Sequence, residues 1–235
     1  ANFSFEDPVV QPVEPYAYPV ITDWIELDMV DTTGGSQNTG VFLNVTGITH
    51  ADGDQIAFLG GQAGNALLQD LSAVYEVGQS YRLTAGVCVS AQSPPLDPNG
   101  LELAFYYQEP GDPNRMDIVA GQTAAPSTFT STELEDNWIY LPTVLADDAW
   151  AGRPIGIAIR GTGPMGGFWD VDNVRVTAYP LVPNFTDDAV VNFADFAVLA
   201  SEWLICGDPL ADVTGEGCVN VNDVLILAEY WLDDL

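Results

Sequence analysis

A twelve-residue segment near the C-terminal end, DVTGEGCVNVND, places oxygen-bearing side chains at alternating positions. Asp212, Thr214 and Glu216 occupy positions 1, 3 and 5 of this segment, and Asp223 occupies position 12. A hard cation such as Ca²⁺ prefers six or more oxygen ligands, and a tight loop with alternating inward side chains can supply them. The spacing therefore predicts a calcium-binding loop over residues 212–223.

The remaining positions of this loop agree with that chemistry. Gly217 at position 6 permits a sharp turn, Cys218 would offer its backbone carbonyl at position 7, and Asn220 stands at position 9. An earlier segment, NFTDDAVVNFAD, repeats the arrangement in a weaker form. Its candidate ligands at positions 1, 3, 5, 7 and 12 are Asn184, Thr186, Asp188, Val190 and Asp195.

Each candidate loop leads into one copy of a repeated helical pattern. The stretches VNFADFAVLASEWL (191–204) and VNVNDVLILAEYWL (219–232) have apolar residues at helical spacing. The first apolar face holds Phe193, Phe196 and Trp203, and the second holds Val221 and Leu225. Two short helices of this kind are expected to bury these faces against each other. A plain helical hairpin without calcium is the alternative reading.

The preceding part of the chain, up to about residue 179, has the pattern of strands. Short β-rich runs are separated by Gly, Pro, Asn and Asp, and no long helical pattern interrupts them. In SYRLTAGVCVS the apolar residues alternate, which places Arg82 and Thr84 on the side expected to face solvent. We therefore expect an antiparallel β-sandwich or jelly roll at 1–179 and a small helical domain at 180–235, separated near the prolines of AYPLVPN.

The duplicated loop and helix, with repeats at 184–204 and 212–232, resemble a type I dockerin module over about residues 184–235. The element "VN…D…LA..WL" and the Asp, rather than Glu, at position 12 of both loops carry this resemblance. The resemblance implies one calcium ion in each loop and a cohesin as the docking partner. Thr at position 3 of both loops and the neutral Asn184 depart from the family pattern and indicate weaker binding.

The strand-rich part resembles the carbohydrate-binding jelly rolls of exported bacterial proteins. NFSFEDP near the start and FWDVDNVRV at 168–176 carry this likeness. By matching position, the resemblance implies a structural calcium ion held by Glu6 and Asp172, with Asp52 and Asp54 as weaker candidates. Ordinary acids at strand ends are the alternative. Aromatic residues that could stack on a sugar are Trp24, Tyr106, Tyr107, Trp138, Tyr140 and Trp150.

Composition indicates an exported protein. The formal net charge is -29, with five Arg and no Lys, which disfavours nucleic acids and anionic membranes as partners. No apolar run is long enough for a membrane helix, and the opening ANFSFEDP reads as a mature N-terminus after signal removal. A disulfide between Cys206 and Cys218 is plausible in an oxidising environment, whereas Cys88 lies in an apolar strand pattern and is expected to be a buried thiol.

The sequence contains no recognisable catalytic arrangement. Its single His is His50, and neither a G-x-S-x-G, an H-E-x-x-H nor a phosphate loop is present. We therefore predict a non-catalytic, calcium-stabilised extracellular surface or matrix protein that acts in assembly, through a cohesin-like partner or through identical subunits. A carbohydrate-binding module attached to a scaffold through its dockerin, with a polysaccharide as partner, is the alternative. A glycosidase fragment is a weaker third reading.

Overall fold

The computed structural model forms two compact units. It describes residues 3–10, 16–17, 21–27, 38–109, 116–142, 144–164, 166–180, 183–186, 190–207, 209–214 and 216–232. The first unit comprises residues 1–74, 83–139 and 153–175. The second unit joins residues 176–235 with two stretches from the strand-rich part of the chain, 75–82 and 140–152. Each unit is described separately below.

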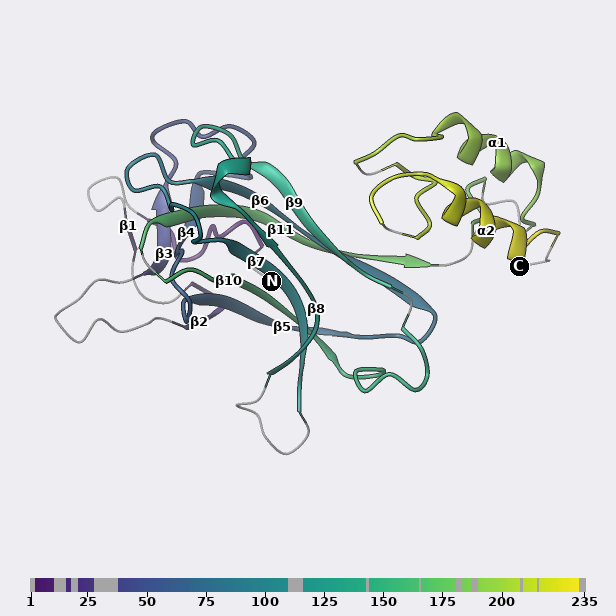
Figure 1. Ribbon diagram of the computed structural model, residues 1–235, viewed down its shortest axis with the longest axis horizontal. Helices are drawn as coiled ribbons and strands as arrows, with labels where there is room; N and C mark the ends of the chain where they lie inside the picture. Colours follow the sequence, from purple (N-terminus) through teal and green to yellow (C-terminus); the bar gives the residue numbers. More distant parts are fainter. Residues whose placement is uncertain are drawn as a thin grey trace. The chain divides into compact units, whose positions relative to one another are not determined.

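The chain is mainly β, and its strands form two antiparallel sheets of a sandwich (Figure 1). The six-stranded sheet has the order β1 (Tyr16–Ala17), β3 (Thr39–Leu43), β4 (Gln55–Gly60), β11 (Phe168–Pro180), β6 (Gln79–Val89), β9 (Glu135–Leu141). The five-stranded sheet has the order β2 (Ile25–Leu27), β5 (Ala66–Val74), β10 (Pro154–Gly161), β7 (Leu101–Gln108), β8 (Met116–Ala124). The sequence prediction of an antiparallel β-sandwich is confirmed at this level. A 3₁₀ turn, η1 (Pro126–Thr128), follows β8.

Large apolar side chains fill the sandwich, as the period-two pattern predicts. Fully buried examples from both sheets are Leu59, Leu67, Leu83, Leu103, Phe105, Ile159 and Trp169. The expectation that Arg82 and Thr84 face solvent is wrong, because both are buried. Cys88, which lies on the same face of β6, packs against Ile56 and Leu134. The face of β6 that was expected to meet solvent is therefore buried, like the face toward the sandwich core.

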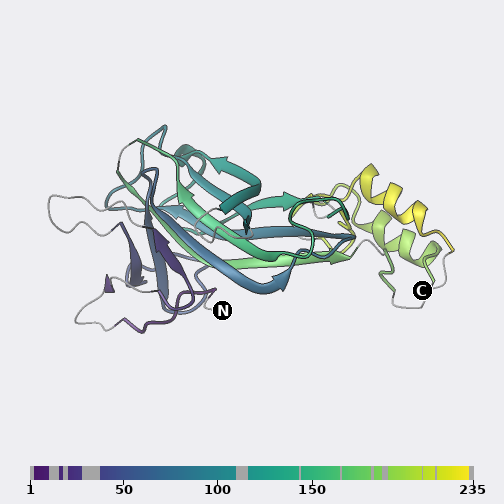
Figure 2. The same ribbon diagram turned by 90° about the horizontal axis from the view of Figure 1, so that it is seen from below.

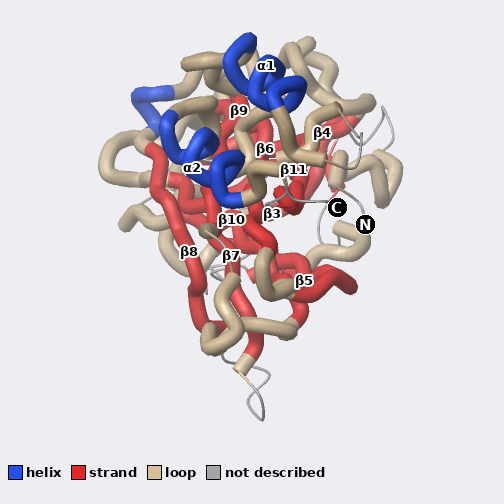
Figure 3. The backbone as a smooth tube through the Cα atoms, turned by 90° about the vertical axis from the view of Figure 1, so that its right-hand side faces the viewer, coloured by secondary structure: helices blue, strands red, loops and turns tan. Residues whose placement is uncertain are grey.

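The second unit contains two short helices, α1 (Phe193–Ser201) and α2 (Val221–Glu229), which lie side by side in both views (Figures 1 and 2). Each helix begins with a capping box, formed by Asn192 with Asp195 in α1 and by Asn220 with Asp223 in α2. These are the only α-helices in the described residues, where strands and loops predominate (Figure 3). None of the described helices is long and apolar enough to cross a bilayer.

The helices do not bury the apolar faces that their spacing predicts. Phe193 is 75% exposed, Trp203 44% and Val221 59%. The core of this unit is built by residues of both repeats and of the segments before the helices: Val191, Leu199, Ala211, Val219 and Leu227. Loop residues that enter this core compete with the helix faces for the same space, which a helical periodicity alone cannot show.

Candidate functional site

A cavity of about 570 Å³ opens on one face of the six-stranded sheet. Three aromatic rings belong to its wall: Phe42 of β3, Phe58 of β4 and Phe168 of β11. The Phe58 and Phe168 rings meet edge to face, with their centroids 5.8 Å apart. The centroids of the Phe42 and Phe58 rings lie 6.4 Å apart. Leu43 of β3 and residues of three connecting segments, at 45–48, 90–93 and 131–132, complete the lining. The cavity is therefore shaped for a compact ligand with apolar surface.

Asp170 of β11 is the one carboxyl group among the described residues that line this cavity. It lies opposite Phe58 in the pairing of β11 with β4. Its side chain is 4% exposed, and burial raises its pKa to about 7. No hydrogen bond to this carboxyl group occurs within the described part of the chain. A buried acid without a hydrogen bond is available to interact with whatever fills the cavity.

Polar groups near the cavity come mainly from hydroxyl and amide side chains. They are Thr46, Ser90, Gln92, Ser93, Ser131 and Thr132. Within the described lining there is no Lys, Arg or His. The wall therefore offers hydrogen bonds and one acid, but no positive charge to hold a phosphate or a carboxylate.

Cys88 lies beside this site as a buried thiol. Burial raises its pKa to about 12, and the neighbouring charges of Asp170 and Glu135 add to the shift. Because the thiolate is the reactive form, we expect no measurable reaction with a thiol reagent in native protein, against one thiol per chain after unfolding in guanidinium. Rapid labelling of Cys88 in native protein would contradict the buried position.

The acids predicted as calcium ligands of the sandwich, from the first and last segments of its sequence, lie near one another. Glu6 Oε1 accepts the backbone N–H groups of Asp54 and Gln55, each at 2.9 Å. Asp172 Oδ2 accepts the N–H of Asp52 at 2.7 Å. Burial raises the pKa of Asp172 to about 7, and the charges of Asp52 and Glu6 add to this effect. The charges of Glu6 and Asp52 therefore act on Asp172, while Asp54 contributes its backbone N–H.

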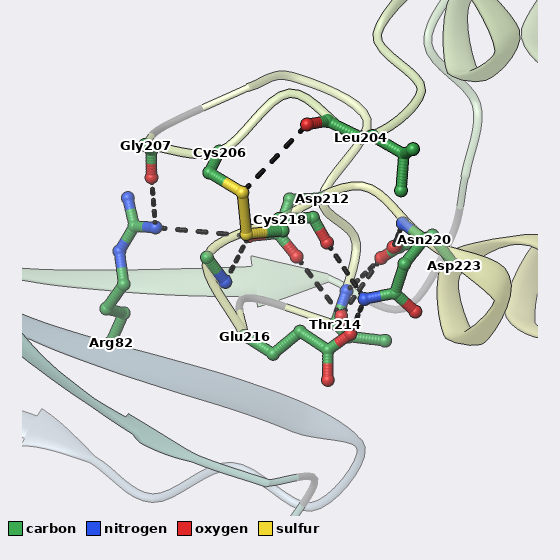
Figure 4. The surroundings of a disulfide bond; sticks show 11 residues. Arg82, Leu204, Cys206, Gly207, Asp212, Thr214, Glu216, Cys218, Asn220 and Asp223 are labelled. Carbon is green, nitrogen blue, oxygen red and sulfur yellow. Dashed lines mark hydrogen bonds and ion pairs between the residues drawn. A yellow bond between two sulfur atoms is a disulfide. The ribbon is translucent and has the colours of Figure 1, made fainter.

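The second loop of the C-terminal unit surrounds two buried carboxylates, Asp212 and Asp223 (Figure 4). Asp212 Oδ2 accepts the N–H of Gly217 at 2.7 Å. Asp223 accepts the backbone N–H and the hydroxyl of Thr214 at 3.1 and 3.0 Å, and the N–H of Asn220 at 2.7 Å. Burial raises the pKa of Asp212, and the charge of Asp223 adds to it. Positions 1, 3 and 12 of the predicted loop therefore converge.

Positions 5 and 7 of this loop are tied to the cap of α2. The Glu216 carboxylate accepts hydrogen bonds from the side-chain amides of Asn220 and Asn222. The Cys218 carbonyl accepts the Asn220 side-chain N–H at 3.1 Å. No group of three or more His, Cys, Asp or Glu side chains forms a metal-binding cluster among the described residues. A cation in this loop would therefore need hydroxyl and carbonyl oxygens beside the carboxylates.

The first loop repeats this network around Asp195. Its carboxylate accepts the N–H and hydroxyl of Thr186, both at 3.0 Å, and the N–H of Asn192 at 2.9 Å. Burial would raise the pKa of Asp195, but these donated hydrogen bonds outweigh it and lower the pKa. The Val190 carbonyl accepts the Asn192 amide at 3.0 Å, as Cys218 does in the second loop. Asn184 is half-buried, and the predicted ligand Asp188 lies outside the described residues.

A disulfide joins Cys206 to Cys218 and closes a ring around the start of the second loop (Figure 4). Closing a ring of this length removes conformational entropy from the unfolded chain, worth about 3 kcal/mol. We expect the double replacement of Cys206 and Cys218 by serine to lower the unfolding free energy of this unit by roughly that amount. Denaturant titration of the variant and of reduced wild type should agree, and an unchanged midpoint in both would contradict this expectation.

The aromatic residues considered for sugar stacking do not form an exposed strip. Trp24, Tyr106 and Tyr107 are buried, and Trp138, Tyr140 and Trp150 are half-buried. The site that the sequence did not predict is the cavity with Asp170. The available signal was the run FWDVD, in which alternation places Phe168, Asp170 and Asp172 on one face of a strand and buried Trp169 and Val171 on the other.

Fold and cavity together define a β-sandwich protein with a ligand-sized pocket on one sheet. No family model matches the chain, and no curated protein matches it. Among solved structures, a cyclase from Fischerella sp. in its apo form is similar with a TM-score of 0.59, at 21% identity over 76% of this chain and 94% of the other. A Fischerella Stig cyclase with a bound indole compound has the same TM-score, at 22% identity over 76% and 95%. At this identity the likeness shows the fold.

Carbohydrate-binding modules also occur among the similar structures. One described as CBM4 has a TM-score of 0.44, at 13% identity over 76% of this chain and 98% of the other. The comparisons give no support to a cohesin-like partner or to association of identical subunits.

The prediction of a non-catalytic assembly protein is contradicted by the Fischerella structures, because these are enzymes built on the same sandwich. That prediction rested on the absence of known catalytic motifs and on the resemblance of the C-terminal repeats to a dockerin. Neither argument decides the function, because one fold can carry binding sites and catalytic sites alike.

Proposed function

We propose that the sandwich binds a small molecule with an apolar ring system in the cavity, and that Asp170 donates a proton to it. The observation that carries this proposal is the buried carboxyl group in a wall of phenylalanine rings. Desolvation favours the neutral form of this acid, so that it can act as a hydrogen-bond or proton donor near neutral pH. The aromatic wall holds the ligand ring and excludes water from the acid.

The proposed chemistry needs one proton transfer within the cavity. Asp170 gives its proton to a basic or polarised atom of the ligand, and the resulting carboxylate regains a proton when product is released or from solvent. A ligand activated in this way can rearrange or close a ring inside the apolar wall. The Fischerella cyclases support this proposal, since they combine a similar fold with bound indole compounds.

Binding of an indole ketone, 4-(1H-indol-3-yl)butan-2-one, tests the pocket. We expect amide NMR signals of the lining residues to shift during titration, and Phe58→Ala and Asp170→Leu to weaken binding by roughly tenfold. Asp136→Asn is the matched control, because Asp136 is an exposed acid of β9 outside the cavity lining. Binding that is unaffected by either pocket variant, or a response to xylohexaose alone, would refute the proposal.

We propose further that calcium stabilises both parts of the protein. In the C-terminal unit, which we interpret as dockerin-like, Asp212, Thr214, Glu216, the Cys218 carbonyl and Asp223 would hold one ion. Asn184, Thr186, Asp188, the Val190 carbonyl and Asp195 would hold a second. The support is the pair of matching networks around Asp195 and Asp223, each of which brings a Thr hydroxyl and a buried carboxylate together.

In the sandwich, Glu6 and Asp172 would hold a further ion with oxygens near Asp52. The support is that Asp172 is buried beside the charges of Glu6 and Asp52, and a cation would offset this repulsion. We also propose that the protein is exported, which the acidic composition and the Cys206–Cys218 disulfide support.

A further inference from the structure

Arg82 lies at the second calcium-type loop, although it comes from strand β6. Its Nη1 donates a hydrogen bond to the Gly207 carbonyl at 3.0 Å and lies 3.9 Å from Asp212 Oδ2 (Figure 4). Arg82 is 5% exposed and Asp212 is 1% exposed. Both contacts fall inside the ring that the Cys206–Cys218 disulfide closes. The guanidinium is therefore fixed against the residue at position 1 of the loop.

Such a placement is unusual for this composition. The chain has five basic and 34 acidic residues, yet one of the five is buried beside a predicted calcium ligand. A buried carboxylate needs a compensating charge or hydrogen bonds, and Asp212 has the acidic Asp223 as a close neighbour. Arg82 supplies a compensating charge in the absence of any ion.

The first loop has no equivalent need. Its position 1 is Asn184, a neutral residue, so no carboxylate there requires a counter-ion. Among the described residues, no Arg contacts the side chain of Asp195. The Asp195 carboxylate accepts its hydrogen bonds from N–H and hydroxyl donors. The second loop therefore has an arginine beside a carboxylate at position 1, whereas the first loop has a neutral residue there.

We infer that Arg82 is a built-in counter-ion of the second loop, which holds Asp212 in place without calcium and weakens calcium binding there. This inference rests on the proposed calcium site. It makes Arg82 a positioning residue that acts through Asp212, and it couples the loop to the end of β6. Because the Arg82 guanidinium and a calcium ion would both lie beside Asp212, the positive charge of the guanidinium repels the ion and lowers its affinity.

The test is isothermal titration of calcium into the full chain and its Arg82→Met, Arg82→Lys and Arg160→Met variants. Arg160→Met is the matched control, since it removes the same charge from a pair with Glu102 in the sandwich. The second-loop phase is identified by its loss in Asp223→Asn. We expect Arg82→Met to raise the affinity of that phase roughly three- to tenfold, while Arg82→Lys and Arg160→Met stay near wild type.

A merely structural role for Arg82 predicts the opposite sign, because a disordered loop binds calcium more weakly. Lowered or unchanged affinity in Arg82→Met therefore overturns the inference but leaves the calcium site standing. Absence of any second-loop phase in wild type overturns both. If Arg82→Met does not fold, Arg82→Gln, which keeps a donor for the Gly207 carbonyl, takes its place with the same expected direction.

Discussion

Replacing Asp223 by alanine is expected to lower the calcium affinity of the second loop by at least about 100-fold, because it removes a charged ligand at position 12. The same change should lower the unfolding free energy of the C-terminal unit by about 2–4 kcal/mol even in chelator. Asp223 is fully buried and accepts hydrogen bonds from Thr214 and Asn220, which would lose their partner. Calorimetric titration and denaturant unfolding measure the two effects.

Thr214→Ala is the control for this prediction. Thr214 contributes a neutral hydroxyl to the same network, so its loss should reduce calcium affinity much less than the loss of Asp223. A larger effect of Thr214→Ala than of Asp223→Ala on calcium affinity would show that the loop positions have been misassigned.

Asp170→Asn is expected to stabilise the protein at pH 8, by roughly 2–4 kcal/mol. Burial raises the pKa of Asp170 from 3.8 to about 7, so the folded state binds this proton more tightly than the unfolded state does. The ionised acid therefore lowers stability progressively as pH rises from about 4 to 7, and the full cost is present above pH 7. The asparagine removes that cost, and its advantage should vanish near pH 4.

Urea titrations of wild type and Asp170→Asn at pH 4, 6 and 8 test this sign. Asp136→Asn, an exposed change on β9, should show no comparable gain at pH 8. Equal stability of wild type and Asp170→Asn at pH 8 would mean that the carboxylate is solvated, and would weaken its assignment as a proton donor. Catalytic groups often reduce the stability of the folded state, because active sites keep polar groups buried where function requires them.

Local sequence patterns predicted strands and helices correctly where the pattern of one face is enough to identify the element. Alternation indicated the antiparallel sandwich, and the repeat before each helix placed Asp195 and Asp223 at the starts of α1 and α2. The same patterns failed for Arg82, because alternation cannot show that distant segments cover the second face of a strand. The exposed face of Phe193 and Trp203 was missed for a similar reason.

The candidate catalytic acid could not be found from sequence alone. Asp170 stands among 34 acids and has no motif around it. Its distinction comes from Phe42, Phe58 and Phe168, which come from three different strands and line the same cavity. Function was consequently predicted from the dockerin-like repeats and from the absence of a catalytic motif, which is a weak basis when one architecture carries binding modules and enzymes alike.

A crystal structure of the protein with the indole ketone bound would show whether the cavity beside Asp170 is the ligand site. We expect the indole ring to lie against Phe58 and Phe168, with a polar ligand atom within hydrogen-bond distance of the Asp170 carboxyl group. An indole bound elsewhere on the chain, or a cavity filled by ordered water at saturating ligand, would contradict it.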